Sequence, residues 1–425
     1  MKNNLSAKAA KLFDSLPWPG PDNEAWRRTH LERLLPKGTL DAAAASPPPG
    51  TSLIDASKLS PAGAQDAETC FVRIITSAGC PQSIYVSEEA RATGVKAFWE
   101  SAENFPAGLE ALENHLFHNP DRVQAWHWRN TPGAAIVQIP KGACLNKPIL
   151  IEETLSADGK NLFSAPHVHI EAGGGSEAEI IWSLHASEAS LQGQRPVVNA
   201  GITGTAEANS KLRVTLRQKL KGEMIFFLNN LFQAERDALV LFMESHTGSS
   251  LVKTHTSAIL DGEGSEIRLN GLYLAGKDQH IDIGTLQDHR APRAVSDALY
   301  KGAVYPGGWS VYQGLIQVQH DAAKTDAYLT NNNLLLGDGA RADSLPQLNI
   351  LTDDVKCSHG STSGKLDSAQ LFYLQSRGFP PVEAERALTE GFLAETLKNL
   401  RGHAAELLHT DLELALKAGT VWADG

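Results

Sequence analysis

Hydrophobic and polar residues alternate in short runs through the middle of the chain, from about residue 126 to residue 350. Runs such as "KLRVTLRQ" (211–218) and "SEIRLNGLYLA" (265–275) are separated by Gly, Asn, Asp and Ser. A period of two residues is typical of β-strands with one buried face, and the separating residues are turn formers. The pattern predicts a mainly β core.

The number of these runs favours a stacked architecture. They are too many for one ordinary sandwich, whereas stacked coils of roughly 20 to 30 residues each hold them naturally. We therefore expect a β-helix, or solenoid, over residues 126–355. The polar run Thr330–Asn333 is expected in the asparagine-rich turns of its coils. A large sandwich or a double-sheet barrel is the structural alternative.

Helical spacing precedes this core. Leu5, Ala9 and Leu12 fall on one helical face, and prolines then break the chain at 17–21. The run at 23–35, "NEAWRRTHLERLL", is expected to resume a helix. The N-terminal part is therefore predicted to begin with two helices.

The rest of the N-terminal part is mixed. The Ala- and Pro-rich stretch at 38–52 is expected to be a surface linker, because three consecutive prolines cannot lie inside a helix. Residues 70–86 are expected to form strands, and residues 109–119 a helix.

Helical periodicity returns after Lys365. Asp367 can cap a helix over 368–377, and Gly378 stands where a helix end needs a positive φ. Two further helices with apolar faces are expected, over 382–400 and 404–419. The sequence thus predicts an N-terminal mostly helical region (1–125), a central β-helix core (126–355) and a C-terminal helical domain (356–425).

Composition and charge narrow the function classes. A net charge of −11 argues against non-specific binding of nucleic acid or of an anionic membrane, since either needs a basic face. No run approaches the ~20 apolar residues of a membrane span, and the start lacks the apolar run of a secretory signal. The four cysteines, Cys70, Cys80, Cys144 and Cys357, are scattered, which fits a reducing compartment. We expect a cytoplasmic protein.

Cys357 and His359 are the strongest candidates for chemistry. They stand two residues apart in "TDDVKCSHGSTSGKLD" (352–367), which is expected to be a short loop, and in an extended segment both would point to one side. A thiolate with an imidazole suits zinc, copper or iron–sulfur chemistry, but two ligands do not complete a four-ligand site. The residues alone leave open whether the pair binds metal or is a buried Cys beside a hydrogen-bonded His.

The residues around this pair carry a family resemblance. "KCSHGST" (356–362), "GKLD" (364–367) and "LFYLQSRG" (371–378) resemble the signature of the SufB/SufD family, β-helical scaffold proteins of the SUF iron–sulfur cluster assembly system. The run at 23–31, the modest length and the few cysteines resemble the SufD members of that family. The resemblance implies a right-handed parallel β-helix flanked by N-terminal and C-terminal helical regions.

The resemblance also implies a function. The chain would be a non-catalytic scaffold that pairs through its β-helix with a SufB-like subunit, or with itself when alone, and binds a SufC-like ATPase through its C-terminal helices. His359 matches the family histidine that, with a SufB cysteine, holds a nascent cluster, and Cys357 would be an interface residue or auxiliary ligand. The iron–sulfur cluster would be transient and shared with SufB, with none tightly bound in the isolated chain.

Other motifs support weaker alternatives. The segment "HVHIEA" resembles the cupin metal motif in its residues His167, His169 and Glu171, but the glutamate follows the histidines at a shorter spacing than in that motif. We therefore expect the two histidines on the outer face of a strand. Gly271–Asp278 matches a P-loop until Asp278 replaces the required Ser or Thr, so we expect no nucleotide site there. No flavin fingerprint is present. The alternative functions are a β-helix enzyme acting on polysaccharide and a cupin-like metal enzyme.

Overall fold

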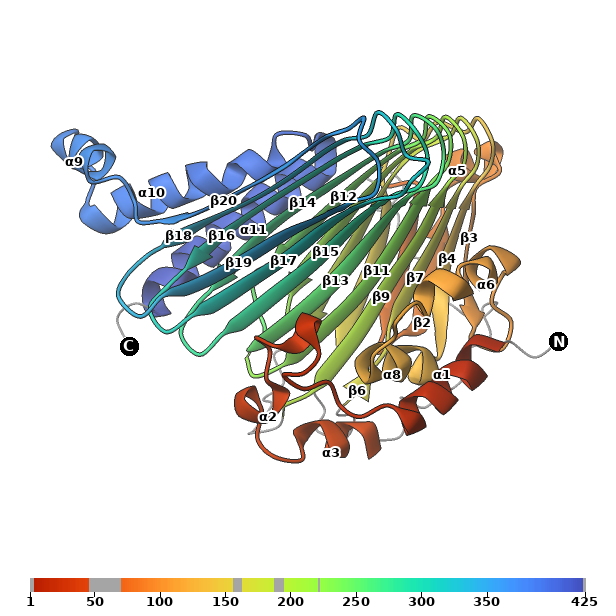
Figure 1. The fold of residues 1–425 in the computed structure, drawn as a ribbon, viewed down its shortest axis with the longest axis horizontal. Coiled ribbons are helices and arrows are strands. Elements are labelled where there is room, and N and C mark those ends of the chain that lie inside the picture. Colours follow the sequence, from red (N-terminus) through yellow and green to blue (C-terminus); the bar gives the residue numbers. More distant parts are fainter. Residues whose placement is uncertain (1–3, 46–69, 156–162, 187–194, 221, 423–425) are drawn as a thin grey trace.

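The computed structural model describes residues 4–45, 70–155, 163–186, 195–220 and 222–422. It is mainly β, with 45% of residues in strands and 24% in helices, and its centre is a parallel β-solenoid of about 7 turns. Figure 1 shows the stack of strands, with one group of helices below it and a second group on the opposite side. The predicted β-helix is confirmed.

The strands form two 10-stranded sheets that face each other. One sheet, called sheet A here, has the order β2-β1-β5-β8-β10-β12-β14-β16-β18-β20, and sheet B has the order β19-β17-β15-β13-β11-β9-β7-β4-β3, with β6 paired to β9. From β7 onward the chain alternates between the sheets, and each strand lies parallel to its neighbours. This alternation defines a solenoid and rules out the sandwich and barrel alternatives.

In chain order the strands are β1 (Val72–Ser77), β2 (Cys80–Val86), β3 (Lys96–Ser101), β4 (Gly133–Ile139), β5 (Ile149–Leu155), β6 (Phe163–Ser164), β7 (His167–Ala172), β8 (Glu177–Ala186), β9 (Val197–Ala206), β10 (Lys211–Lys219), β11 (Ile225–Ala234), β12 (Leu239–His246), β13 (Leu251–Leu260), β14 (Glu266–Ala275), β15 (His280–His289), β16 (Val295–Val304), β17 (Trp309–Val318), β18 (Asp326–Leu335), β19 (Arg341–Ile350) and β20 (Lys356–Gly364).

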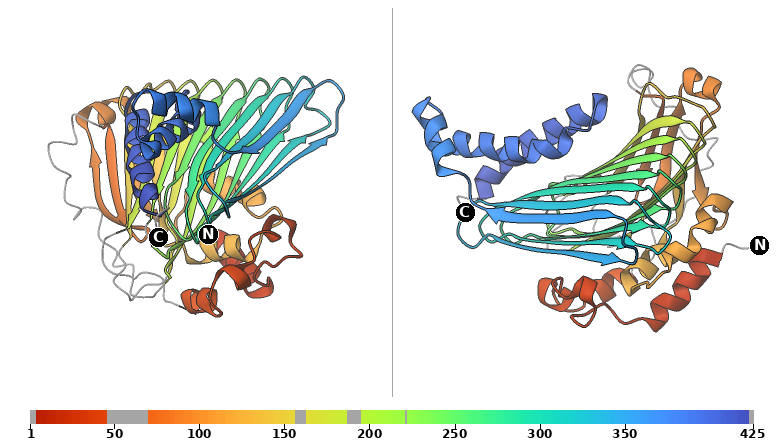
Figure 2. Two further views of the ribbon diagram at one scale, coloured as in Figure 1. Left: turned by 90° about the vertical axis from the view of Figure 1, so that its left-hand side faces the viewer. Right: turned by 45° about the horizontal axis from the view of Figure 1, so that its top comes forward.

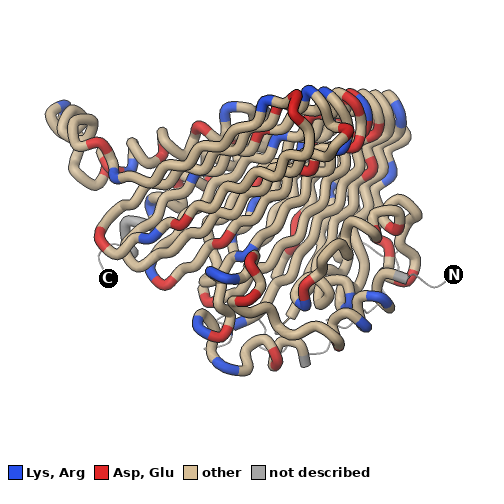
Figure 3. The backbone as a smooth tube through the Cα atoms, viewed as in Figure 1, with Lys and Arg blue, Asp and Glu red and all other residues tan. Residues whose placement is uncertain are grey.

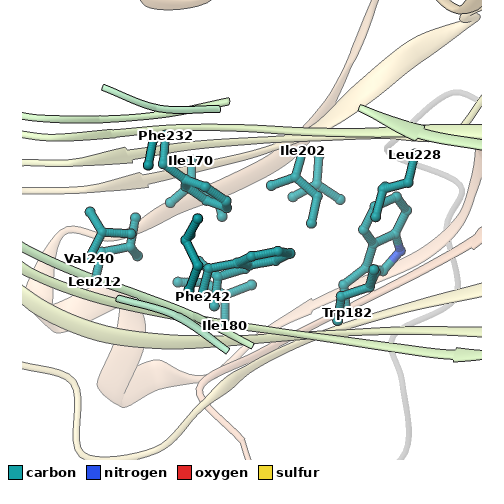
Figure 4. Packing of buried hydrophobic residues seen from close by; sticks show 14 of the residues in the cluster. Ile170, Ile180, Trp182, Ile202, Leu212, Leu228, Phe232, Val240 and Phe242 are labelled. Carbon is teal, nitrogen blue, oxygen red and sulfur yellow. The ribbon is translucent and has the colours of Figure 1, made fainter. Parts of the chain in front are cut away.

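The interior is built from every second residue of each strand. In β10, Leu212, Val214 and Leu216 point inward and are fully buried. The parallel register places Leu212 beside Val240 of β12, so that apolar side chains stack from coil to coil. Figure 4 shows this packing. Burial of this stack supplies the main driving force for the fold.

Most of the N-terminal helices cover the outer face of sheet B. They are α1 (Asn4–Ser15), η1 (Glu24–Trp26), α2 (Leu31–Leu34), α3 (Thr39–Ala45), α6 (Ala107–Ala111), α7 (Glu113–Leu116) and α8 (Arg122–Asn130). The remaining helix, α5 (Glu88–Thr93), lies between β2 and β3 in the chain and packs on the main core through Ala90. The linker expected at 38–52 begins with α3, and its remainder lies outside the described residues.

The helix predicted over 23–35 is interrupted. Only η1 and the four residues of α2 are helical there. The reason is tertiary: Trp26 is buried against the sheet, and Thr29 is fully buried and donates a hydrogen bond to Asp282 of β15. Lys253 of β13 also donates to the carbonyl of Ala25 at 2.7 Å. These contacts outweigh local helix propensity.

The C-terminal helices are α9 (Ser368–Ser376), α10 (Pro381–Leu393), η3 (Ala394–Leu397) and α11 (Gly402–Trp422). As predicted, the Asp367 side chain caps α9 by accepting from the amide of Ala369, and Gly378 has φ 94°. The later helices lie on the outer face of sheet A, where Asp411 forms a buried ion pair with Arg217 and a partly buried one with Lys219.

Figure 3 shows Lys and Arg intermixed with Asp and Glu along the coils, without a continuous basic stripe in this view. Within the described part of the chain, no helix has the length and apolar character needed to cross a membrane.

Candidate metal-ligating site at the open end of the solenoid

The last coil of the solenoid consists of β19 and β20. Each is the outermost strand of its sheet, so each has one edge without a neighbouring strand. Figure 2 shows these two strands at the end of the stack. We call this surface the open end.

The Cys357–His359 segment lies on β20 and is not a loop, so that expectation was wrong. Gly360 and the flanking serines carry little strand propensity. The backbone is nevertheless held in a parallel ladder with β18, in which Cys357 lies beside Ala327 and His359 beside Leu329. Stacking on the preceding coil imposes the extended conformation that the sequence alone does not favour.

This register fixes where the two side chains point. Ala327 and Leu329 are fully buried, inward-facing residues of β18. Cys357 and His359 therefore occupy inward positions of the last coil, as their spacing of two predicted, but no further described coil lies over them. Cys357 is half-buried against the main core, and His359 is exposed.

The polar run at 330–333 lies under the same strand. It was expected in turns, but it belongs to β18, with Asn331 and Asn333 buried inside the solenoid. Tyr273 donates a hydrogen bond to Asn333 at 2.7 Å, and Asn331 donates one to Tyr273 at 3.1 Å. The interior is therefore polar below the second half of β20, beside Ser361 and Ser363, because these amides pair with one another and with Tyr273.

The electrostatic setting keeps the thiol protonated. Partial burial, together with the negative charge of Asp326, raises the pKa of Cys357. A thiol of this kind is a poor nucleophile at neutral pH. It would become a metal ligand only when a bound metal displaces its proton.

Among the described residues, no group of three or more His, Cys, Asp or Glu side chains is arranged to hold a metal ion. His359 and Cys357 are one imidazole and one thiol, whereas iron–sulfur and zinc sites commonly take four protein ligands. The geometry can supply part of a coordination sphere at an accessible surface, and further ligands would have to approach from outside the solenoid.

The surroundings of the pair include apolar residues that sequence reasoning missed. Leu348 and Ile350 of β19 are inward-facing by register and are 38% and 37% exposed, and Leu351 is 39% exposed. In the sequence, these apolar residues look like those of an ordinary buried strand. They are exposed only because their strand belongs to the last coil of the stack. Such an exposed apolar cluster beside free strand edges is typical of an interaction surface.

The other candidate motifs lie elsewhere. His167 and His169 point outward from β7, as predicted, but α8 covers them and both are buried. The glycine motif at 271–278 runs along β14 into a turn instead of opening a helix. Neither lies at the open end, and neither has the surroundings of the alternative site it suggested.

Fold and site together define a class of protein: a parallel β-solenoid with helices at both chain ends and an open terminal coil that presents an imidazole and a thiol. The chain matches the family model described as "SUF system FeS cluster assembly, SufBD core domain" over residues 155–392. It belongs to the SufB/SufD family.

One relative points to the SufD side of that family. The chain is 34% identical over 290 residues to the iron–sulfur cluster assembly protein SufD of Escherichia coli (strain K12), covering 66% of this chain and 67% of that protein. It is 29% identical over 288 residues to a SufBD family protein of Mycobacterium leprae (strain TN), covering 66% of this chain and 71% of that protein. The chain is therefore SufD-like.

Proposed function

We propose that this chain is a non-catalytic scaffold subunit of the SUF iron–sulfur cluster assembly system. It pairs through the open end with a SufB-like subunit, presents His359 and Cys357 to a nascent cluster between the two chains, and binds a SufC-like ATPase through its C-terminal helices. Family membership favours this role over the polysaccharide-active alternative. Cys80, Cys144 and Cys357 are free thiols, which supports a cytoplasmic setting.

One observation carries the proposal: in the described part of the chain, an imidazole stands exposed on the last strand of a solenoid whose end no further coil covers. Solenoids normally protect their ends with capping elements, because free strand edges and exposed core positions drive association. A partner strand added to β20 would cover the inward positions of His359 and Cys357. Its own side chains could then complete the coordination sphere.

A divided site suits assembly chemistry. The cluster is cargo, so it must be held and then released. When the ligands lie on two chains, a small movement of one chain against the other changes the number of ligands bound to iron. Exposure of His359 and partial burial of Cys357 are compatible with such movement.

The C-terminal helices support the ATPase assignment. α9 buries none of its residues against the solenoid, and Phe372 and Tyr373 are 72% and 56% exposed. Phe379 and Val382, just beyond α9, are 44% and 56% exposed. Figures 1 and 2 show α9 extending beyond the solenoid. Aromatic residues concentrated in this way are typical anchors of a protein interface.

The test of the cluster site uses the whole complex. The chain is co-produced with SufB-like and SufC-like subunits, and the purified complex is supplied anaerobically with iron, sulfide and reductant. His359→Ala is expected to abolish the visible absorption of the assembled cluster while the complex still forms. His320→Ala, another exposed histidine in the turn after β17, is the control and should keep the cluster. Normal cluster formation in His359→Ala would refute the ligand assignment.

The test of the ATPase contact uses α9. The double substitution Phe372→Ala and Tyr373→Ala is expected to prevent capture of the SufC-like subunit. Val295→Ala removes an apolar side chain that is 36% exposed on β16, outside the C-terminal helices, and it should leave capture unchanged. Undiminished capture by the α9 variant would place the ATPase elsewhere.

A further inference from the structure

A row of histidines lies between α8 and the outer face of sheet B, far in the fold from the open end. His127 comes from α8, His167 and His169 from β7, and Thr203 from the adjacent strand β9. All four side chains are buried, each with an exposure of 3% or less, and the row ends at Glu171. We call these five residues the relay.

Hydrogen bonds join the relay into one chain. His127 Nδ1 lies 2.6 Å from the carbonyl oxygen of Asn199, and His127 Nε2 lies 3.0 Å from His167 Nδ1. On the other side, Thr203 Oγ1 lies 3.0 Å from His167 Nε2 and 2.8 Å from His169 Nδ1. His169 Nε2 lies 3.1 Å from Glu171 Oε1.

The local backbone is built around these contacts. A Cβ atom on Gly201 would lie 2.6 Å from His167 Nδ1 and 2.9 Å from His127 Nε2, so any larger residue would part the two rings. A Cβ atom on Gly108 of α6 would lie 2.2 Å from Glu171 Oε1. Both ends of the row therefore depend on residues without a side chain.

The number of hydrogen atoms that the relay residues can donate determines whether the relay carries an extra proton. The chain contains five hydrogen bonds, and it ends in two groups that only accept, the carbonyl of Asn199 and the carboxylate of Glu171. Three neutral imidazoles and one hydroxyl supply four hydrogens, whereas five bonds need five. With every residue neutral except Glu171, two acceptors face each other somewhere along the row.

We propose that the relay is a proton-binding site: it holds one extra proton at neutral pH, so that one of its histidines is a buried imidazolium paired with Glu171. The same five bonds are satisfied with the extra proton on His169 or on His127, provided that the hydroxyl of Thr203 turns and the rings between exchange tautomers. The positive charge of this one proton can therefore be located on His127 of α8 or on His169 of β7, so the proton is shared between the N-terminal helices and the solenoid.

The resting position of this proton is His169. Burial lowers the pKa of His127 to about 4, and burial, together with the repulsion from a protonated neighbouring histidine, holds the pKa of His167 well below its usual range. The hydrogen bond from His169 lowers the pKa of Glu171, which is therefore ionised. Glu171 also accepts from the amide of Gln138 at 2.8 Å.

The charges that face the relay are its own. Of the elements packed on it, β4 contributes the neutral Gln138, and α6 contributes Gly108. Arg129 of α8 pairs with Asp14 of α1, away from the row, and Glu110 of α6 is exposed. The described structure thus offers Glu171 as the counter-ion of the imidazolium.

The test is nitrogen-15 NMR of the full-length protein labelled at histidine, at pH 7.5, with signals assigned by single substitutions. We expect one imidazolium, His169, with both ring nitrogens protonated, and neutral His127 and His167 with the proton on Nδ1. Three neutral rings in the native protein would overturn the proposal.

Two variants separate a relay from an ordinary ion pair. Thr203→Val splits the row into pieces that neutral histidines can satisfy, so the imidazolium signal should disappear although Glu171 is still present. If the imidazolium signal persists in Thr203→Val, the residues form only a His169–Glu171 ion pair, and the relay proposal is wrong. Glu171→Gln supplies the fifth hydrogen from its amide and should also leave three neutral rings. If Thr203→Val does not fold, Glu171→Gln serves as the test in its place. An imidazolium retained in Glu171→Gln would also contradict the proposal.

Discussion

The two ends of the solenoid are finished in opposite ways. At the N-terminal end, β2 is the outermost strand of sheet A and β3 the outermost strand of sheet B, and α5 connects them across the stack. At the other end, β19 and β20 are outermost, and no described element crosses between them to close the interior. The first end is plugged and the second is open.

The plugged end has structural features that prevent its strand edges from pairing with another chain. Ala90 of α5 and the adjoining Phe71 and Val95 belong to the main core and are buried. β2 runs antiparallel to β1 with a shift of register near Thr76, and it contains Pro81, which cannot donate to another strand. Proline and bulges are the usual means by which a strand edge is protected.

The open end has fewer of these protective features. β20 contains no proline, and β19 contains one, Pro346. Core positions that are buried in every earlier coil are exposed in the last, including Leu348 and Ile350. The chain therefore contains the features that protect a solenoid end, but it uses them at only one of its two ends. The exposed end is therefore best explained as a surface for a partner.

The largest effect is expected from a charge placed in the plug. Ala90→Glu puts a carboxylate into a position with 0% exposure, where it has no partner. Burying an unpaired charge should lower the free energy of unfolding by about 4 kcal/mol or more, as measured by urea denaturation. Ala92→Glu, the same change at an exposed position of α5, should cost less than about 0.5 kcal/mol. Equal effects would mean that α5 does not close the core.

A charge at the open end should act on association instead of folding. Leu348→Glu leaves the added carboxylate in water, because Leu348 is already 38% exposed. We expect about 100-fold weaker binding of the SufB-like partner, or about 2.7 kcal/mol, with little change in unfolding of the isolated chain. Leu414→Glu on α11 is the control for a leucine replaced at an exposed site. Unaltered binding of the Leu348→Glu variant, measured by calorimetry, would show that the partner uses another surface.

The plugged end also contains a fully buried acidic group. Glu153 of β5 is fully buried, and burial raises its pKa to about 7, although Thr76 and the amide of Gly79 donate to it. The folded state then holds this proton more tightly than the unfolded state. Stability is therefore fully present below pH 4.5 and falls as the pH rises towards 7, by up to about 1.4 kcal/mol per pH unit.

Glu153→Gln should remove this slope. Compared with the native protein, the free energy of unfolding of the variant should rise by about 2 to 3 kcal/mol between pH 5 and pH 7, as measured by denaturation at both pH values. Glu152→Gln changes the neighbouring, partly exposed carboxylate and should keep the native slope. A pH dependence unchanged by Glu153→Gln would mean that this carboxyl is ionised at neutral pH.

The sequence predicted much of this architecture, and its omissions have a physical cause. Period-two alternation as in β10 reports burial of one face, which local residues determine, so the strands were recognised. β20 was missed because its extended form comes from pairing with β18, a contact about 30 positions away along the chain. The spacing of Cys357 and His359 correctly placed both on one side of the chain. That this side is uncovered depends on where the stack ends, and no local pattern encodes it.

The smallest effect on stability is expected at His359. Its ring is exposed, and no described residue forms a hydrogen bond with it, so His359→Ala should change the free energy of unfolding of the isolated chain by less than about 0.5 kcal/mol. Cys357→Ala should cost about 1 kcal/mol, because the half-buried sulfur contacts the core. Urea denaturation of the two variants checks this order. A larger loss for His359→Ala would show that the ring supports the last coil. A loss of cluster in the assembled complex could then reflect a disordered strand, whereas a stable His359→Ala chain ties that loss to the imidazole itself.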